Sequence, residues 1–172
     1  MLKNVKLYEE EAERKAKETW YDLKYQWWCG WCGTREFNFA SDNYNSHCFA
    51  SVDPKTNEVI GLMGYEVDWA AKSTSGFYAA SFDVSGYAIF VKDLLEMIDD
   101  IFMKYDFKRM EWCCWADNPA IRGYRKFCKR VGGREVGTLY RAGILLDGQI
   151  HDNVIFELLQ EDYLKAKQEG RI

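Results

Sequence analysis

The C-terminal third of the chain, residues 108–159, constrains the possible fold most. It opens at 108–115 with an alternating run rich in large side chains, which is typical of a half-buried β-strand. An Asp-Asn-Pro sequence at 117–119 then supplies a helix N-cap and a proline at the first helical position, where a missing N–H does no harm. A Gly-Gly pair at 132–133 supplies the left-handed end of that helix. Its apolar face is predicted from the residues at helical spacing, which are Ile121, Tyr124, Phe127, Cys128 and Val131.

A β-hairpin is predicted after this helix. Two strand-like runs, 135–146 and 149–159, are joined by Asp-Gly at 147–148, a strong signal for a two-residue hairpin turn. The polar tail after Tyr163 is expected to fray. The sequence therefore predicts a strand, a helix and a hairpin in its last third.

The chain before residue 108 also alternates between strands and helices. The patterns predict a short strand or arm at 1–6, a helix from 9 to about 23, strands at 47–52, 58–67 and 77–84, and an amphipathic helix from 90 to 105. The resulting order is β-α-loop-β-β-β-α-β-α-β-β. We expect one α/β (α+β) domain over residues 1–172.

Composition narrows the class of protein. The net charge is −4 and the pI is near 5.3. These values argue against nonspecific nucleic-acid binding, because such binding needs a basic surface. No run approaches the roughly 18–20 apolar residues that a membrane-spanning helix needs, and the charged N-terminus lacks a signal-peptide pattern. We therefore expect a cytoplasmic protein that engages neither membranes nor nucleic acid.

The order and spacing of the residues over about 90–160 resemble the GCN5-related N-acetyltransferase (GNAT) superfamily. The matching residues are Asn118-Pro119-Ala120, Tyr124-Arg125-Lys126-Phe127, Gly132-Gly133, Asp147-Gly148 and His151-Asp152. The resemblance implies a mixed central sheet of six or seven strands, flanked by helices, that splays between its fourth and fifth strands and ends in the C-terminal hairpin. It also implies that the pantetheine arm of acetyl-CoA, the co-substrate, pairs with the fourth strand inside the splay. The pyrophosphate then meets the N-terminus of the next helix, where free amides and the helix dipole favour an anion.

The resemblance places the acetyl-CoA site mainly on the loop after the fourth strand. The expected cofactor-binding residues are Phe82, Asp83, Val84, Ser85, Gly86, Tyr87, Ala88, Asn118 and Tyr124. This loop departs from the family pattern Gln/Arg-x-x-Gly-x-Gly/Ala, because Gly86 is its only glycine and the basic first residue is missing. Asp83 is unfavourable for an anionic ligand. Asn118 lies six residues before Tyr124 rather than the family's seven, so helix capping alone would also explain it.

Acetyl transfer needs an acid to protonate the departing thiolate and a base to deprotonate the amine. The resemblance places Tyr124 beside the CoA sulfur as the acid, although its ring would also suit simple packing on the apolar helix face. The candidate bases are Asp83, Glu111 and Glu66, and a chain of water molecules is the alternative to all three. Backbone N–H groups around residues 82–84 are expected to polarise the thioester carbonyl.

The aromatic, cysteine-rich segment 25–48 falls where GNAT proteins carry a variable, substrate-covering region. We expect Trp27, Trp31 and Glu66 on the substrate side, and exposed aromatic residues would also suit a homodimer. Cys29 and Cys32, followed by a His-Cys pair at 47–48, approximate a zinc knuckle. Adjacent residues of a strand face opposite sides, so His47 and Cys48 are poorly placed to bind one ion, and we expect no metal. Because the sequence shows no secretory signal, we expect the cysteines to be reduced.

The predicted function is acetyl-CoA-dependent N-acetylation of an unidentified primary amine on a small molecule or a peptide. The alternative is a catalytically inactive GNAT-fold binding module with a degenerate CoA site. A small zinc-containing partner-binding domain is a third possibility. Neither the acceptor nor the base follows from the sequence.

Overall fold

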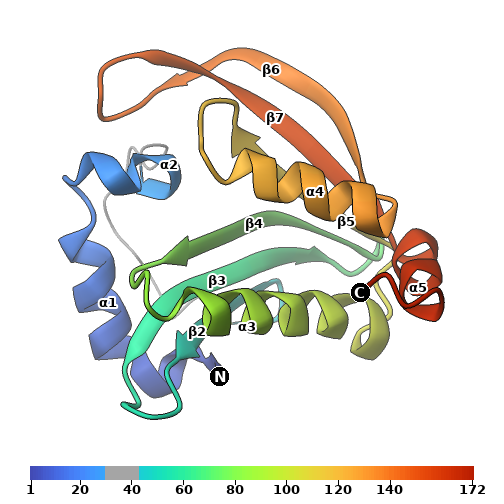
Figure 1. Ribbon diagram of the computed structural model, residues 1–172, viewed down its shortest axis with the longest axis horizontal. Helices are drawn as coiled ribbons and strands as arrows, with labels where there is room; N and C mark the ends of the chain where they lie inside the picture. The colour runs from blue at the N-terminus through green and yellow to red at the C-terminus, as the bar shows by residue number, and fades with distance from the viewer. Residues whose placement is uncertain (30–42) are drawn as a thin grey trace.

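The computed structural model describes residues 1–28, the backbone of residue 29, and residues 43–172 (Figure 1). The strands form a seven-stranded mixed sheet in the order β1-β2-β3-β4-β5-β7-β6. The elements are β1 (Leu2–Asn4), α1 (Glu9–Glu18), α2 (Gln26–Cys29), β2 (Ser46–Val52), β3 (Val59–Asp68), β4 (Ser73–Ser81), α3 (Tyr87–Asp99), β5 (Arg109–Trp115), α4 (Ile121–Val131), β6 (Arg134–Ile144), β7 (Ile150–Leu159) and α5 (Gln160–Gln168). The predicted fold class and the C-terminal hairpin are confirmed. None of the described helices is long and apolar enough to cross a bilayer.

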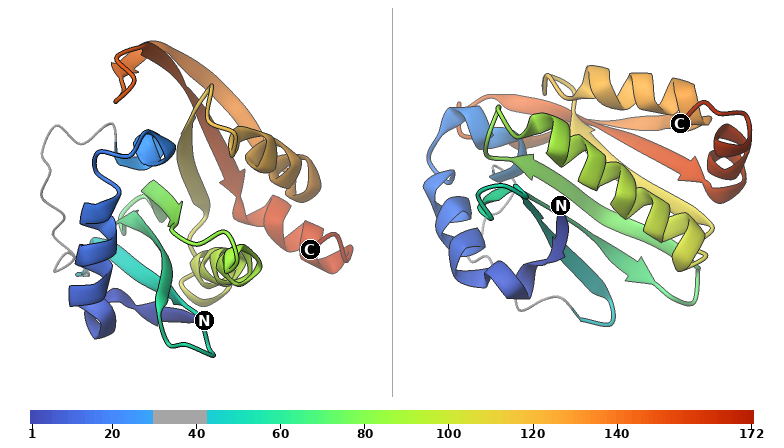
Figure 2. Two further views of the ribbon diagram at one scale, coloured as in Figure 1. Left: turned by 60° about the vertical axis from the view of Figure 1, so that its left-hand side comes forward. Right: turned by 60° about the horizontal axis from the view of Figure 1, so that its bottom comes forward.

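Helices cover both faces of the sheet, so each face has its own apolar core (Figure 2). On one face, Ala12 and Ala16 of α1 pack with Leu62 of β3. On the other, α3 and α4 bury a larger cluster that includes Phe90 and Trp112. The predicted alternation of β5 follows from this arrangement, since its even-numbered residues enter the larger core and its odd-numbered residues face the opposite side.

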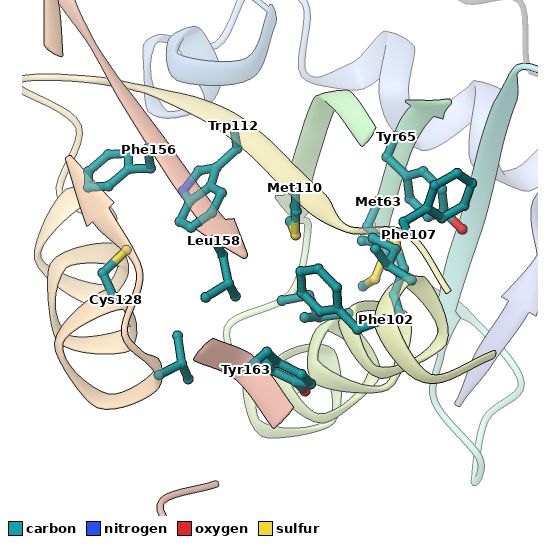
Figure 3. Close-up of a cluster of buried hydrophobic side chains, with 14 of the residues drawn as sticks. Met63, Tyr65, Phe102, Phe107, Met110, Trp112, Cys128, Phe156, Leu158 and Tyr163 are labelled. Atoms are coloured by element: carbon teal, nitrogen blue, oxygen red, sulfur yellow. The ribbon is translucent and has the colours of Figure 1, made fainter. Parts of the chain in front are cut away.

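Aromatic side chains fill much of the larger core (Figure 3). The rings of Trp112 and Phe156 stack with centroids 5.4 Å apart and planes 10° apart. Tyr163 lies against Phe102 with centroids 5.0 Å apart, and its hydroxyl donates to Asp99 at 2.7 Å. Much of the chain's high aromatic content is therefore used for packing.

The contact of Tyr163 with α3 corrects the prediction of a fraying tail. Residues 160–168 form α5, in which Tyr163 and Ala166 are buried. Lys167 pairs with the same Asp99 carboxylate at 2.5 Å. Tyr163 and Ala166 lie three residues apart on α5 and bury its apolar side, and Tyr163 and Lys167 share the Asp99 carboxylate. These contacts order a segment whose composition is mostly polar.

The sheet splays between β4 and β5, as predicted. These parallel strands pair only at Ser73 with Arg109 and at Thr74 with Met110. Beyond these pairs, β5 remains paired with β7 along its whole length, and β4 remains paired with β3. Figure 1 shows the β6–β7 hairpin rising away from β4. We call the part of the sheet beyond Thr74 and Met110, where β4 and β5 no longer pair, the splay.

The register of β4 decides which of its amides face the splay. Phe82 N donates to Ile60 O at 2.8 Å, so these residues form a hydrogen-bonded pair of the antiparallel ladder. Such pairs alternate along a strand, so Ala80 also bonds to β3. The N–H and C=O groups of Ala79 and Ser81 therefore point away from β3 and into the splay.

The close approach of α3 to the sheet requires a glycine at position 61. A Cβ atom there would lie 2.5 Å from the Phe90 ring and 2.7 Å from Ala80 O. We expect Gly61→Ala to lower the free energy of unfolding by about 1–3 kcal/mol, because the core must shift to admit a methyl group. Gly123→Ala is the matched control, since nothing lies within 4 Å of its Cβ position on α4.

The control should raise the free energy of unfolding by about 0.5–1 kcal/mol, because alanine loses less backbone entropy in a helix. Urea unfolding of both variants measures the two effects. Equal changes of the same sign would contradict the close packing of α3 on β3.

Candidate functional site

Tyr124 lies on the inner face of α4, as its helical spacing predicted. Its ring packs between Trp112 and Phe156, each with a centroid distance of 6.1 Å. In the described part of the chain, its hydroxyl has no hydrogen-bond partner. The predicted packing role and an available hydroxyl therefore coexist in one side chain.

The surroundings of Tyr124 keep its hydroxyl protonated. Burial raises the pKa of Tyr124 above its usual range, and the neighbouring Cys114 and Tyr87 raise it further. Cys114 belongs to β5 and Tyr87 is the first residue of α3. The Tyr124 hydroxyl thus lies near the splay, between the start of α3 and the C-terminal half of β5. It is neutral there and can donate a proton.

The loop between β4 and α3 is folded around an aspartate. Asp83 accepts hydrogen bonds from Ser85 Oγ at 2.6 Å and from Ser85 N at 2.8 Å. These bonds hold the pKa of Asp83 below its usual value, which makes its carboxylate a weak base. They also occupy an amide that a bound phosphate group would otherwise use.

The rest of this loop suits an anion at the start of α3. Gly86 occupies the N-cap position, and a Cβ atom there would lie 2.9 Å from Ile60 Cδ1. Val84 and Tyr87 are exposed on either side of Gly86. Tyr87 N donates to Val84 O at 3.3 Å, so the amide of Ala88 is a better candidate for an anion than that of Tyr87. The loop therefore combines a favourable helix end with one unfavourable charge.

Phe82 differs from the expected cofactor contacts because its backbone groups already have partners. Its N–H bonds to Ile60, as described above, and its C=O accepts from the Tyr25 hydroxyl at 3.2 Å. The amides that face the splay belong to Ala79 and Ser81, which the sequence analysis did not single out. The missing information was the strand register, which no local pattern specifies.

Asn118 forms a turn just before α4, whose N-cap position is occupied by Ala120. Asn118 Oδ1 accepts from Ala120 N at 2.9 Å, and α4 begins at Ile121 rather than at Pro119. The Asn118 side chain is therefore used in the turn that leads into the helix, and it does not cap the helix itself. The neighbouring Asp117 does not cap the helix and instead contacts His151.

The two other candidate bases lie apart from Tyr124. Glu111 is on the opposite face of β5 and is paired with Arg109, which also bonds to Glu157 at 2.8 Å. Glu66 pairs with Ser75 of β4, next to the closed end of the splay. The structure therefore brings neither carboxylate together with the tyrosine hydroxyl.

The aromatic segment is described only in part. Trp31, Cys32 and the Cys29 side chain fall outside the described residues. Cys48 is buried on the α1 face of β2, whereas His47 stacks on Tyr105 with centroids 6.2 Å apart. Among the residues that the structure describes, no group of three or more His, Cys, Asp or Glu side chains is arranged to hold a metal ion.

His151 is the functional candidate that the sequence analysis missed. Its Nδ1 lies 3.0 Å from Asp117 Oδ2, and its Nε2 lies 3.1 Å from Asp147 Oδ2. The ring of Trp27 contacts it edge-on, with centroids 5.5 Å apart. Its position four residues after the hairpin aspartate was the available sequence signal, but the Asp117 contact depends on tertiary structure.

Solved structures with the same architecture identify the fold. A GCN5-related N-acetyltransferase from Brucella melitensis is 17% identical, with a TM-score of 0.67, over 97% of this chain and 78% of the other. A mutant of the spermidine N-acetyltransferase SpeG from Vibrio cholerae is 16% identical, with a TM-score of 0.69, over 97% of this chain and 99% of the other. Spermidine/spermine N-acetyltransferase SpeG from the same organism, in complex with manganese ions, is 20% identical, with a TM-score of 0.60, over 72% and 70%.

These likenesses show that the chain has the GNAT fold, as the sequence predicted. At this level of identity they define the architecture rather than the chemistry. No protein-family model matches the sequence, and no curated protein matches it.

Proposed function

We propose that this protein is an acetyl-CoA-dependent N-acetyltransferase that acts on a primary amine. The observation that carries the proposal is the end of β4–β5 pairing after Thr74 and Met110, which leaves strand amides directed into the splay. The fold and the neutral Tyr124 hydroxyl near the splay support it.

Each part of the site has a role in this proposal. The amides of Ala79 and Ser81 bind the pantetheine arm as a neighbouring strand would. The start of α3 holds the pyrophosphate. As the amine nitrogen bonds to the thioester carbonyl carbon and the carbon–sulfur bond breaks, Tyr124 donates its proton to the departing thiolate. The proton lost by the amine passes to water, since Asp83, Glu111 and Glu66 are placed or paired unfavourably for that step.

The proposed acceptor is a small amine. Solved structures of the same fold are named as spermidine N-acetyltransferases, so polyamines are the first compounds to test. We also propose a cytoplasmic location. A homodimer stays a prediction, supported by the exposed apolar side chains of edge strand β6, Val136, Leu139, Tyr140 and Ile144.

Calorimetry with acetyl-CoA, followed by thiol-release assays with a panel of amines that includes spermidine, tests the proposal. Binding with amine-dependent thiol release is the expected result. If acetyl-CoA fails to bind at millimolar concentration, the noncatalytic binding module becomes the better description.

Substitution of Asp83 is predicted to raise, rather than lower, the affinity for acetyl-CoA. Asp83→Asn should tighten acetyl-CoA binding about fivefold, because it removes a negative charge near the pyrophosphate and keeps an oxygen to accept from Ser85 N. The gain in affinity should shrink with added salt, since the interaction is exposed. Calorimetry at two salt concentrations measures it. Loss of turnover in this variant, with binding retained, would instead identify Asp83 as the base.

A further inference from the structure

Helix α2 and the turn before it are attached to the end of β4. The Tyr25 hydroxyl donates to Phe82 O at 3.2 Å, and the two rings lie 6.4 Å apart. The Trp28 ring lies 6.0 Å from that of Phe82. This short segment therefore rests on the strand that forms one side of the splay.

The same segment is attached to the β6–β7 hairpin, on the other side of the splay. Gln26 Nε2 donates to Asp147 Oδ2 at 3.3 Å, and Asp147 N donates back to Gln26 Oε1 at 3.2 Å. Trp27 contacts His151, as described above. Residues 25–28 thus bridge the open end of the splay, and Figure 1 shows α2 between the end of β4 and the hairpin. We call residues 25–28 the α2 bridge.

His151 lies where the β5–α4 turn, the β6–β7 hairpin and the α2 bridge meet. Its side chain is buried, and its two nitrogens face Asp117 from the β5–α4 turn and Asp147 from the hairpin. Among the residues that the structure describes, these two carboxylates are the charged groups that act on it. The α2 bridge presents the uncharged Trp27 ring, and β5 presents Trp115 at 6.5 Å.

Only the protonated ring can donate to both carboxylates at once, because neutral imidazole carries a single N–H. Burial opposes protonation of His151, but the hydrogen bonds to Asp147 and Asp117 outweigh it and raise the pKa of His151. A group whose pKa is raised by folding stabilises the folded arrangement below its unfolded value of about 6.5. That contribution is lost as pH rises through the raised value.

We propose that His151 is a positioning residue whose protonated ring holds the hairpin tip to the β5–α4 turn and so fixes Asp147, to which the α2 bridge is bonded. Trp27 is thereby kept over the open end of the splay, where the proposed amine substrate would enter. Deprotonation weakens this hold and loosens the α2 bridge. The effect on the amine substrate rests on the proposed function, whereas the hold on the α2 bridge does not.

Nuclear magnetic resonance and hydrogen exchange test the hold without any substrate. The chain has two histidines, so H47Q leaves the His151 ring as the one imidazole to titrate, and D117N and H151Q below are both made in the H47Q background. We expect its midpoint above 6.5, and a lower midpoint in D117N, whose side chain is 68% exposed and tolerates substitution. Amide exchange at 25–28, corrected for its intrinsic pH dependence, should accelerate severalfold across this midpoint in H47Q.

In H151Q the same amides should exchange fast at every pH. D117N provides a second variant in case H151Q is poorly folded, and its exchange should accelerate at a lower pH than in H47Q. A His151 midpoint at or below 6.5, or equal exchange in H47Q and H151Q, would overturn the proposal.

Kinetics test the consequence for the amine. The ratio of KM for the amine in H151Q to that in H47Q cancels the titration of the amine itself. We expect this ratio to be about threefold to tenfold at pH 6 and to fall toward one above the His151 midpoint, with kcat little changed. A constant ratio of one with active enzyme would remove the positioning role, whereas absent turnover with the expected exchange pattern would remove only the proposed function.

Discussion

Tyr124→Phe is expected to lower kcat roughly a hundredfold to a thousandfold, which is the usual contribution of a positioned general acid. The substitution removes a hydroxyl that forms no hydrogen bond in the described structure and leaves the ring against Trp112 and Phe156. The affinity for acetyl-CoA and the free energy of unfolding should therefore change little. Steady-state thiol release, calorimetry and urea unfolding measure the three quantities.

Tyr140→Phe is the matched control, because Tyr140 lies on β6 and is 80% exposed. It should have wild-type kcat. An unchanged kcat in Tyr124→Phe would assign the ring to packing alone and leave thiolate protonation to solvent. A rise in kcat above pH 8 in Tyr124→Phe, where a thiolate needs less protonation to leave, would further support the acid role.

Ala79→Pro is expected to have the second largest effect. Proline removes an N–H that the register directs into the splay, where β4 behaves as an edge strand and tolerates it. Loss of one hydrogen bond of about 1–1.5 kcal/mol should weaken acetyl-CoA binding about tenfold. If this amide also faces the thioester carbonyl, kcat should fall by a further hundredfold or so.

The neighbouring Ala80 provides a test of the register itself. Its N–H is directed to Leu62 of β3, and its side chain is 5% exposed. Ala80→Pro should therefore break the ladder in the middle of the sheet and unfold at a much lower urea concentration than Ala79→Pro. Similar stability of the two variants would mean that β4 does not have the alternation described.

The elements that could be predicted from sequence have short-range causes. Gly132 adopts φ +89° at the end of α4, as the Gly-Gly pair predicted. Gly148 adopts φ +74° in the hairpin turn, but the predicted two-residue turn is wrong, because Leu145 N donates to Gln149 O at 3.2 Å and Gly148 N donates to Leu145 O at 3.0 Å, so the connection is longer than Asp147-Gly148. Tyr124 faces inward because its neighbours on α4 repeat at helical spacing. Boundaries were less accurate, since β4 begins at Ser73 and ends at Ser81 rather than spanning 77–84.

The predicted site shows where such patterns stop being informative. The loop that includes Asp83 and Gly86 lies at the start of α3, as the resemblance implied, yet the sequence could not show that Ser85 folds back onto the aspartate. The sequence analysis named Glu66 and Glu111 as candidate bases because they lie on or near central strands. Their actual positions depend on where the sheet opens and on which face each strand presents.

The sequence by itself determined the order of strands and helices, the hairpin and the inward placement of Tyr124, because each depends on residues a few positions apart. Tertiary structure alone decided which β4 amides face the splay, and it brought Gln26 to Asp147 across 121 residues. Contacts of that range depend on how two halves of a twisted sheet separate and what bridges them. That geometry is set by the packing of the whole chain and is absent from any local pattern.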